Sequence, residues 1–290
     1  TIVLQIPATN TTPVILERLS NCIYLVLKFV KDNESASFEE FASVPQSLVE
    51  ILEPLPENSK AEIFKTLGLF FESDQLYALI EPIVDDLLLN VFLPVFIHDP
   101  ESIFALDTQE AIDIMYPQND DGATPVSAVA SILRNNAKKL ASNTLTIASH
   151  IDLENEIIVF AYLTMLGCVG PEFSESDISE LASLIESATQ LLGGNEYNIC
   201  SACSLFSGLP RIEGIHEICE AVIQVFAGTE NDIVKYMATI ALANLLKHSY
   251  DKKEEITAFI GEGLTETIQA VFEMNQKYPT EYMANAVVEF

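Results

Sequence analysis

The residues best suited to chemistry are two pairs of metal-binding side chains. Cys200 and Cys203 form the first pair, and His216 and Cys219 form the second. Two such pairs of thiolate and imidazole ligands could hold a tetrahedral zinc ion. Zinc-binding pairs usually lie on tight turns that wrap the metal, whereas Cys200 and Cys203 lie inside an apolar stretch with helical periodicity. We therefore expect these side chains to pack in the core, with no metal and no cofactor bound.

Catalysis by a nucleophile or a general base is weakly supported. Cys22 and Cys168 lack the glycine-rich elbow and the basic surroundings that activate a thiol. Neighbouring carboxylates are frequent because the whole chain is acidic, and the histidines are scattered. Neither a phosphate-binding Gly–Lys motif nor a dinucleotide fingerprint is present. The sequence predicts a protein that is not an enzyme. The candidates set aside are His98, His150, His216, His248, Asp85–Asp86 and Asp120–Asp121.

The charge balance restricts the partners that this chain can bind. It has 43 acidic residues against 14 Lys and Arg, a formal net charge of −29. No Lys or Arg lies between Lys65 and Arg134 or between Lys139 and Arg211. Such a surface repels nucleic acids and anionic membranes and attracts basic segments, although solubility alone is an alternative explanation. We expect a protein partner with basic segments, and no nucleic acid, membrane or small-molecule substrate.

Composition also bears on the class of protein and its compartment. Apolar residues make up 49 % of the chain, which excludes a disordered acidic tail. Five cysteines, an odd number, do not form a disulfide framework, so the cytoplasm or the nucleus is expected. The apolar stretch from Leu76 to Ile97 is interrupted by Glu81 and Pro82, which predicts core rather than a membrane span. A start at Thr1, without an initiator Met or a secretory signal, predicts a segment of a longer protein.

The elements that would position these residues form a repeat. An Asn followed by an acidic residue occurs at Asn155, Asn195 and Asn231, which are 40 and 36 positions apart. Asn is a good N-cap and a carboxylate is favourable in the first turn, so each Asn predicts the start of a helix. Apolar or small residues 7, 10, 11 and 14 positions further on predict one buried face of each helix. They are Tyr162, Met165, Leu166 and Val169, then Ala202, Leu205, Phe206 and Leu209, then Ala238, Ala241, Leu242 and Leu245.

A further helix is expected before each of the last two Asn residues. These helices run from Leu181 to Leu192 and from Ile215 to Phe226. Glycine follows both, at Gly193–Gly194 and at Gly228, and glycine relieves left-handed strain at a helix C-terminus. Units of two or three helices at such spacings stack on one another in repeat proteins.

This repeat resembles the armadillo repeat. The stretch from Asn231 to Leu246 is similar to the third helix of that family's unit. Downstream, Ile256–Ile260 and Gly261–Phe272 resemble the first and second helices of a next unit. The likeness is clearest over residues 177–272. The family's pattern of small, small, apolar, Asn and apolar residues falls on Ala238, Ala241, Leu242, Asn244 and Leu245.

The resemblance is weaker elsewhere in the chain. Over residues 14–90, Phe38–Leu52 resembles a first helix, a bend at Pro45 and a second helix, and Lys60–Phe71 follows as a third. The opening segment, Thr1–Ile6, and the closing segment, Tyr282–Val288, look like fragments of further units. An irregular insert, at about 98–150, contains a loop-like stretch from Pro117 to Pro125.

The resemblance implies an all-α protein, a right-handed α–α superhelix that forms a single repeat domain over residues 1–290. Its third helices would line a concave groove that binds an extended peptide. The positions that carry Trp in peptide-binding members hold Thr164, Ser204 and Ile240 here. A HEAT-type solenoid and an unrelated helical bundle are the alternatives, because any packed helix has regular apolar columns. The positions that carry Asn hold Cys168, Gly208 and Asn244, and for Asn244 a structural role in bridging neighbouring backbone is equally expected.

Three functions follow from these observations. The first is a scaffold or adaptor whose acidic concave surface binds a protein partner. The second is a receptor for basic segments, of the nuclear-transport or client-chaperone type, but the chain has no Trp for the aromatic slots that hold Lys side chains. The third is a zinc-binding or hydrolytic enzyme, which the residues support least.

Overall fold

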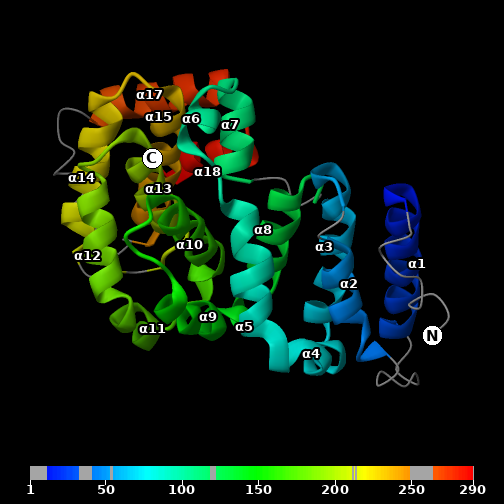
Figure 1. Ribbon diagram of the computed structural model, residues 1–290. Coiled ribbons are helices and arrows are strands. Elements are labelled where there is room, and N and C mark those ends of the chain that lie inside the picture. Colours follow the sequence, from blue (N-terminus) through cyan, green and yellow to red (C-terminus); the bar gives the residue numbers. More distant parts are fainter. Residues whose placement is uncertain are drawn as a thin grey trace. The chain divides into compact units, whose positions relative to one another are not determined.

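The computed structural model describes residues 12–32, 41–52, 55–117, 122–210, 212, 214–248 and 264–289 (Figure 1). Every regular element in these ranges is a helix, and they contain no strand. This confirms the all-α class that was predicted from helical periodicity and from the scarcity of alternating β-branched residues. Residues 118–121 of the expected loop from Pro117 to Pro125, which include the carboxylate pair Asp120–Asp121, lie outside the described residues, and so does the expected helix at Ile256–Ile260.

The described chain divides into two compact units. Unit 1 comprises residues 1–95 and 119–139, and unit 2 comprises residues 96–118 and 140–290. The expected irregular insert at about 98–150 is therefore shared between the units. It is largely helical, with α6 (Pro100–Phe104), α7 (Thr108–Met115), α8 (Pro125–Asn135) and α9 (Ala137–Thr146). A single repeat domain over the whole chain stays a prediction.

Helix α3 forms the centre of unit 1. It packs against α1 on one side and α8 on the other (Figure 1). Pro45 lies in the first turn of α2 and not at a bend between two helices, because proline at this position sacrifices no helical hydrogen bond. The predicted third helix, Lys60–Phe71, is confirmed as part of α3. The α-helices of this unit before α8 are α1 (Pro13–Lys31), α2 (Val44–Leu52), α3 (Glu57–Glu72), α4 (Asp74–Ile80) and α5 (Val84–Leu87).

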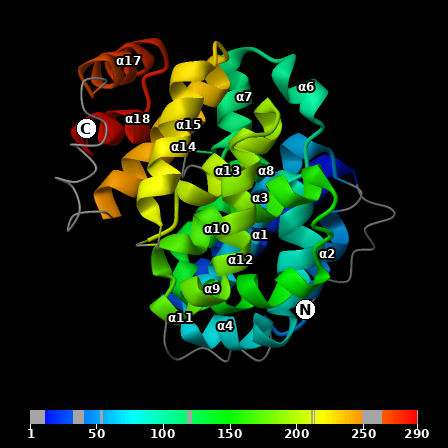
Figure 2. The ribbon, with the colours of Figure 1, turned by 90° about the vertical axis from the view of Figure 1, so that its left-hand side faces the viewer.

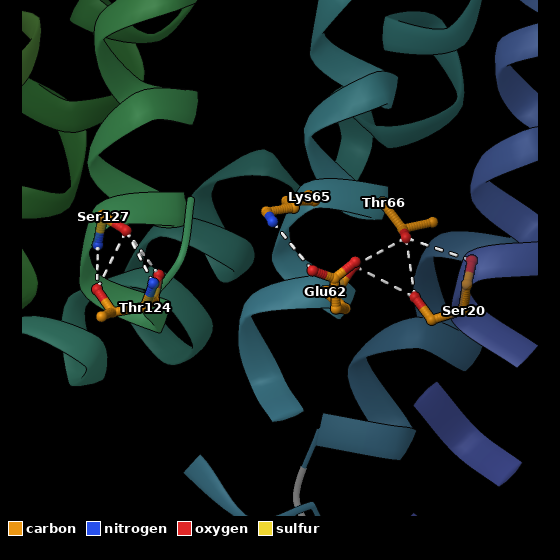
Figure 3. Close-up of polar contacts among 6 residues, drawn as sticks. All are labelled: Ser20, Glu62, Lys65, Thr66, Thr124 and Ser127. Carbon is orange, nitrogen blue, oxygen red and sulfur yellow. Dashed lines mark hydrogen bonds and ion pairs between the residues drawn. The ribbon is translucent and has the colours of Figure 1, made fainter. Parts of the chain in front are cut away.

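A buried hydroxyl pair joins α1 to α3. Ser20 Oγ and Thr66 Oγ1 lie 2.8 Å apart, and both hydroxyls reach the carbonyl oxygen of Glu62 (Figure 3). On the other side, Thr124 and Ser127 form a capping box at the start of α8. Buried polar groups with partners cost little stability, so the Ser20–Thr66 pair joins α1 to α3 without weakening the core.

The apolar stretch from Leu76 to Ile97 is packed in the protein core. It consists of short helical pieces, and the ring of Phe92 packs on Phe64 and Phe71 with centroids 6.1 and 6.0 Å away. No helix in the described part of the chain is both long enough and apolar enough to cross a bilayer. The pieces after α5 are the π-helix η5 (Leu88–Phe92) and the 3-10 helix η6 (Leu93–Phe96), and η4 (Glu81–Ile83) precedes α5.

Unit 2 contains the repeat. Helix α10 packs against α13, α13 against α15, and α15 against α18, as Figures 1 and 2 show. We call these four helices the helix row. Helix α12 precedes α13 and packs on it, and α14 stands in the same relation to α15. The bounds are α10 (Glu156–Val169), α11 (Glu175–Glu180), α12 (Ala182–Leu191), α13 (Glu196–Phe206), α14 (Ile215–Gly228), α15 (Asp232–His248), α17 (Leu264–Lys277) and α18 (Glu281–Glu289), with the 3-10 helices η7 (Ile147–His150) and η8 (Gly170–Glu172).

The predicted caps and apolar columns are confirmed. The side chains of Asn155, Asn195 and Asn231 accept backbone N–H bonds at the starts of α10, α13 and α15. All twelve residues of the predicted columns are buried. The predicted left-handed glycines at helix ends are wrong, because only Gly122 and Gly214 have positive φ among the described residues. The helices end at the expected places by turns that need no left-handed residue.

Candidate functional site

The four zinc candidates lie on two helices. Cys200 and Cys203 lie in α13, and His216 and Cys219 lie in α14. All three cysteines are buried. In the described part of the chain, no group of three or more His, Cys, Asp and Glu side chains could hold a metal ion. The structure therefore places the candidates in packed helices and not on the tight turns that zinc pairs prefer.

The protonation of these thiols follows from their burial. Burial raises the pKa of Cys203 and of Cys219 to about 12. Burial also raises the pKa of Cys200 well above its usual value, and the nearby Cys203 and Glu196 raise it further. Thiolates are the form that binds metals and attacks substrates, so these protonated thiols act as small apolar side chains.

The histidines and paired carboxylates occupy unrelated places. His98 follows η6, and burial lowers its pKa. His150 is exposed in η7, and His248 ends α15. Asp85–Asp86 is exposed in α5. The three histidines lie in separate segments of unit 2, and Asp85–Asp86 belongs to unit 1. A general acid–base site requires such groups within hydrogen-bond reach of one substrate.

The predicted groove residues are largely inside the protein. Thr164, Ser204 and Ile240 are buried, and so are Cys168 and Gly208. These five residues therefore do not form an exposed surface of unit 2. Segment 96–118 also packs on this part of unit 2: α7 packs on α15, and the hydroxyl of Tyr197 in α13 donates to the carbonyl oxygen of His98 at 3.1 Å. No local pattern predicts these contacts, because segment 96–118 lies outside the repeat in sequence.

Asn244 has the structural role that was expected as an alternative. Its side-chain amide donates to the carbonyl oxygens of Phe206 and Leu209, both at 2.8 Å. Phe206 is the last residue of α13 and Leu209 lies three residues after it, at a helix end where backbone acceptors lack helical partners. Asn244 therefore joins α15 to α13 at the C-terminal edge of the row.

Backbone contact between α10 and the end of α13 explains the small residues at their C-termini. A Cβ atom added to Gly208 would lie 1.7 Å from the carbonyl oxygen of Gly167. A Cβ atom added to Gly167 would lie 2.2 Å from the carbonyl oxygen of Ser204. Only glycine lets the two backbones come this close. Gly208 was predicted to face a partner, but in the structure it packs against the backbone of α10.

A ladder of side chains runs along the opposite, N-terminal edge of the row. Asn195 Nδ2 donates to Glu156 Oε2 at 3.4 Å, and Asn231 Nδ2 donates to Glu196 Oε2 at 2.9 Å. Each Asn thus caps its own helix and contacts the first residue of the preceding helix. Because N-termini meet at this edge and C-termini meet at the other, α10, α13 and α15 are parallel and in register. We call these contacts the Asn–Glu ladder.

The last step of the ladder uses different residues. Lys277 and Tyr278, just before α18, both donate to the carboxylate of Asp232 in α15, Tyr278 at 2.9 Å. Burial alone would raise the pKa of Asp232, but the hydrogen bonds from Lys277 and Tyr278 hold it below its usual value. The repeated Asn and acidic residues are visible in the sequence, but the contact between them is not. The signal was their common spacing, which puts equivalent residues of stacked units side by side.

Comparisons with known proteins identify no relative. No protein-family model matches the chain, and no significant match was found among curated proteins or among solved structures. The armadillo resemblance therefore rests on the residues of the repeat and remains a prediction.

Proposed function

We propose that this protein is a non-enzymatic scaffold of the armadillo-like type, a right-handed α–α superhelix whose acidic surface binds a protein partner with basic segments. The observation that carries this proposal is the parallel, in-register arrangement of α10, α13 and α15 with the Asn–Glu ladder. Repeats that stack by the same contact extend a surface from unit to unit, and stacked-helix proteins use such surfaces to bind other proteins.

The charge of one stretch indicates the kind of partner. Residues 140–210, which we call the acidic segment, contain nine acidic residues and no Lys or Arg. Opposite charges steer association and fix the register of a complex. A partner segment rich in Lys and Arg is therefore the favoured ligand. The exposed carboxylates are Asp152, Glu154, Glu156, Glu172, Glu175, Glu180, Glu186 and Glu196.

The partner would contact these carboxylates and not the predicted groove residues. Thr164, Ser204 and Ile240 are buried, so they offer no slot for a Lys side chain. This argues against a receptor that reads basic signals through aromatic slots, since such slots need exposed rings. Broad electrostatic attraction with modest contacts fits the exposed residues better.

A basic peptide tests the proposal. Binding of a fluorescent Lys/Arg-rich peptide to the full chain is measured by anisotropy while NaCl is raised. Between about 50 and about 500 mM NaCl, screening should weaken binding at least about tenfold. Binding that does not respond to salt would contradict the electrostatic basis.

Charge reversal then locates the surface. The triple variant Glu175→Lys, Glu180→Lys, Glu186→Lys alters exposed residues of the acidic segment. The matched control, Glu50→Lys, Glu81→Lys, Asp85→Lys, makes the same charge change on exposed residues of unit 1. We expect the first variant to weaken binding several-fold more than the second. Equal weakening would mean that net charge alone attracts the peptide, and the acidic segment would lose its assigned role.

A further inference from the structure

Segment 96–118 contacts the helix row near both of its ends. Toward its C-terminal end, α7 packs on α15, and Ala111, Ile112 and Met115 of α7 are buried. At its start, the backbone carbonyl oxygen of His98 accepts a hydrogen bond from the hydroxyl of Tyr197 in α13 at 3.1 Å. The position of the segment on the row therefore depends on an apolar contact and on a polar one.

Tyr197 is the residue of the row that receives the start of the segment. It is 2 % exposed, and its ring lies against Phe160 of α10 with the ring centroids 4.9 Å apart. Burial raises the pKa of its hydroxyl, which therefore remains a hydrogen-bond donor at neutral and mildly acidic pH. A packed ring of this kind does not follow its partner, so the hydrogen bond is kept only while His98 stays in place.

The imidazole of His98 lies where a positive charge is unfavourable. The residue is half-buried, and its Nε2 atom is buried without a hydrogen-bond partner among the described residues. In a neutral imidazole Nε2 can be the nitrogen that carries no hydrogen. In the charged form both nitrogens carry hydrogen, so Nε2 would become a buried donor without an acceptor. Burial accordingly lowers the pKa of His98.

The charged groups around this contact are carboxylates. Glu156 and Asp99 lie near enough to the hydroxyl of Tyr197 to raise its pKa, and the buried thiol of Cys200 has the same effect. Both carboxylates are exposed, so water screens their attraction for a charged imidazole. The pKa of His98 is lowered in spite of these carboxylates, which shows that burial outweighs them.

We propose that His98 makes the docking of segment 96–118 dependent on pH: the segment stays on the row while the imidazole is neutral and leaves it when the imidazole is protonated. A charged ring must reach water to be solvated, and the backbone carbonyl of His98 moves with it. The hydrogen bond from Tyr197 is then lost, and α7 loses the contact that holds the start of its segment. The open form exposes the part of α13 around Tyr197.

The pH range follows from the direction of the shift. In the open form His98 is solvated and has its ordinary pKa of 6.5, and in the docked form its pKa is lower. Between the two values only the open form binds the proton, so the docked form loses stability as the pH falls. The ratio of open to docked molecules should rise by up to about tenfold from about pH 7.5 to about pH 5.5.

Hydrogen exchange of the full chain, read by mass spectrometry, measures this ratio. The exchange rate of the α7 amides is compared at about pH 7.5 and about pH 5.5, after correction for the intrinsic rate at each pH. In wild type we expect the corrected rate of α7 to rise about three- to tenfold toward acid pH. Helix α3 of unit 1 is the reference in the same sample, and its corrected rate should change less than about twofold.

Substitution of His98 tests whether this imidazole is responsible. Glutamine cannot take up the proton, so in His98→Gln the corrected rate of α7 should be the same at both pH values within about twofold. The matched control is His150→Gln, which removes an exposed histidine of the same unit and should respond like wild type. Circular dichroism at both pH values establishes that the variants are folded.

Either of two results would overturn the proposal. A corrected α7 rate in wild type that stays constant or falls toward acid pH would mean that the nearby carboxylates stabilise the charged imidazole in the docked segment. An equal rise in wild type and in His98→Gln would assign the response to another titrating group. The first result requires no substitution, so it decides even if a variant does not fold.

Discussion

Two glycines of unit 2 are required by close backbone contact between helices. Gly208 and Gly167 lie where the end of α13 touches α10, and a Cβ atom on either would overlap a carbonyl oxygen. Gly228, by contrast, would place a Cβ atom in open space, with nothing within 4 Å. Glycine is therefore required at some positions and not at others, and only the tertiary contacts distinguish the two cases.

Replacement of glycine by alanine should distinguish these positions. We expect Gly208→Ala to lower the free energy of unfolding by about 1–3 kcal/mol or more, because the backbone carbonyl of Gly167 cannot move away as a side chain could. Gly228→Ala should leave it unchanged or raise it by about 0.4–1 kcal/mol, because alanine restricts the unfolded chain. Urea unfolding monitored by circular dichroism gives both values. Equal effects would mean that α10 and α13 are not in backbone contact.

Asn244 shows how a residue that fits a binding motif can serve packing instead. Its side-chain amide donates two hydrogen bonds to carbonyl oxygens of the chain itself, those of Phe206 and Leu209. A single position could not distinguish the two roles in sequence, because a side-chain amide suits a peptide ligand and a neighbouring helix end equally well.

At the scale of elements, the Asn–Glu ladder sets the register of neighbouring helices. Asn231 caps α15 through Ile233 N at 2.9 Å and also donates to Glu196 at the start of α13. Asn155 caps α10 by accepting hydrogen bonds from the backbone N–H groups of Ile157 and Ile158. A cap and an interhelical contact are thus combined in one side chain.

Substitution of Asn by Asp separates the cap from the ladder. An aspartate at position 231 keeps the cap acceptor, but it removes the donor and places a carboxylate beside Glu196. We expect Asn231→Asp to lower the free energy of unfolding by about 0.5–1.5 kcal/mol, the net value of one hydrogen bond. The matched Asn155→Asp variant should be neutral or slightly stabilising, since an anion is favourable at a helix N-terminus. Thermal or urea unfolding of both variants measures these changes. If Asn231→Asp is as neutral as Asn155→Asp, the Asn–Glu ladder does not contribute to the free energy of unfolding.

At the scale of the whole molecule, repulsion among the excess carboxylates destabilises the folded state. A net charge of −29 is confined to a smaller volume in the folded state than in the unfolded chain. The described ion pairs offset only a small part of it. In the Lys139–Asp74 pair the carboxylate is fully exposed, so solvent screens the attraction.

Salt should therefore stabilise the folded protein. Raising NaCl from about 10 to about 100 mM shortens the screening length from about 30 to about 10 Å, which reduces repulsion among exposed carboxylates. We expect the unfolding temperature to rise over this range. The variant Glu175→Gln, Glu180→Gln, Glu186→Gln should respond less, because it carries three fewer charges on exposed positions. An unfolding temperature that falls with salt would mean that favourable ion pairs outweigh the repulsion.

The sequence by itself determined the helices of unit 2 and their inner faces. Asn155, Asn195 and Asn231 cap helices, and the columns that follow them are buried, because capping and apolar spacing act within a few turns of one helix. Tertiary structure alone decided what each helix touches. The Asn195–Glu156 contact joins residues 39 positions apart, and segment 96–118 packs on the row, although it lies outside the repeat in sequence. The predicted groove residues are largely buried. Local periodicity could not predict this, because exposure depends on which elements pack together in the folded chain.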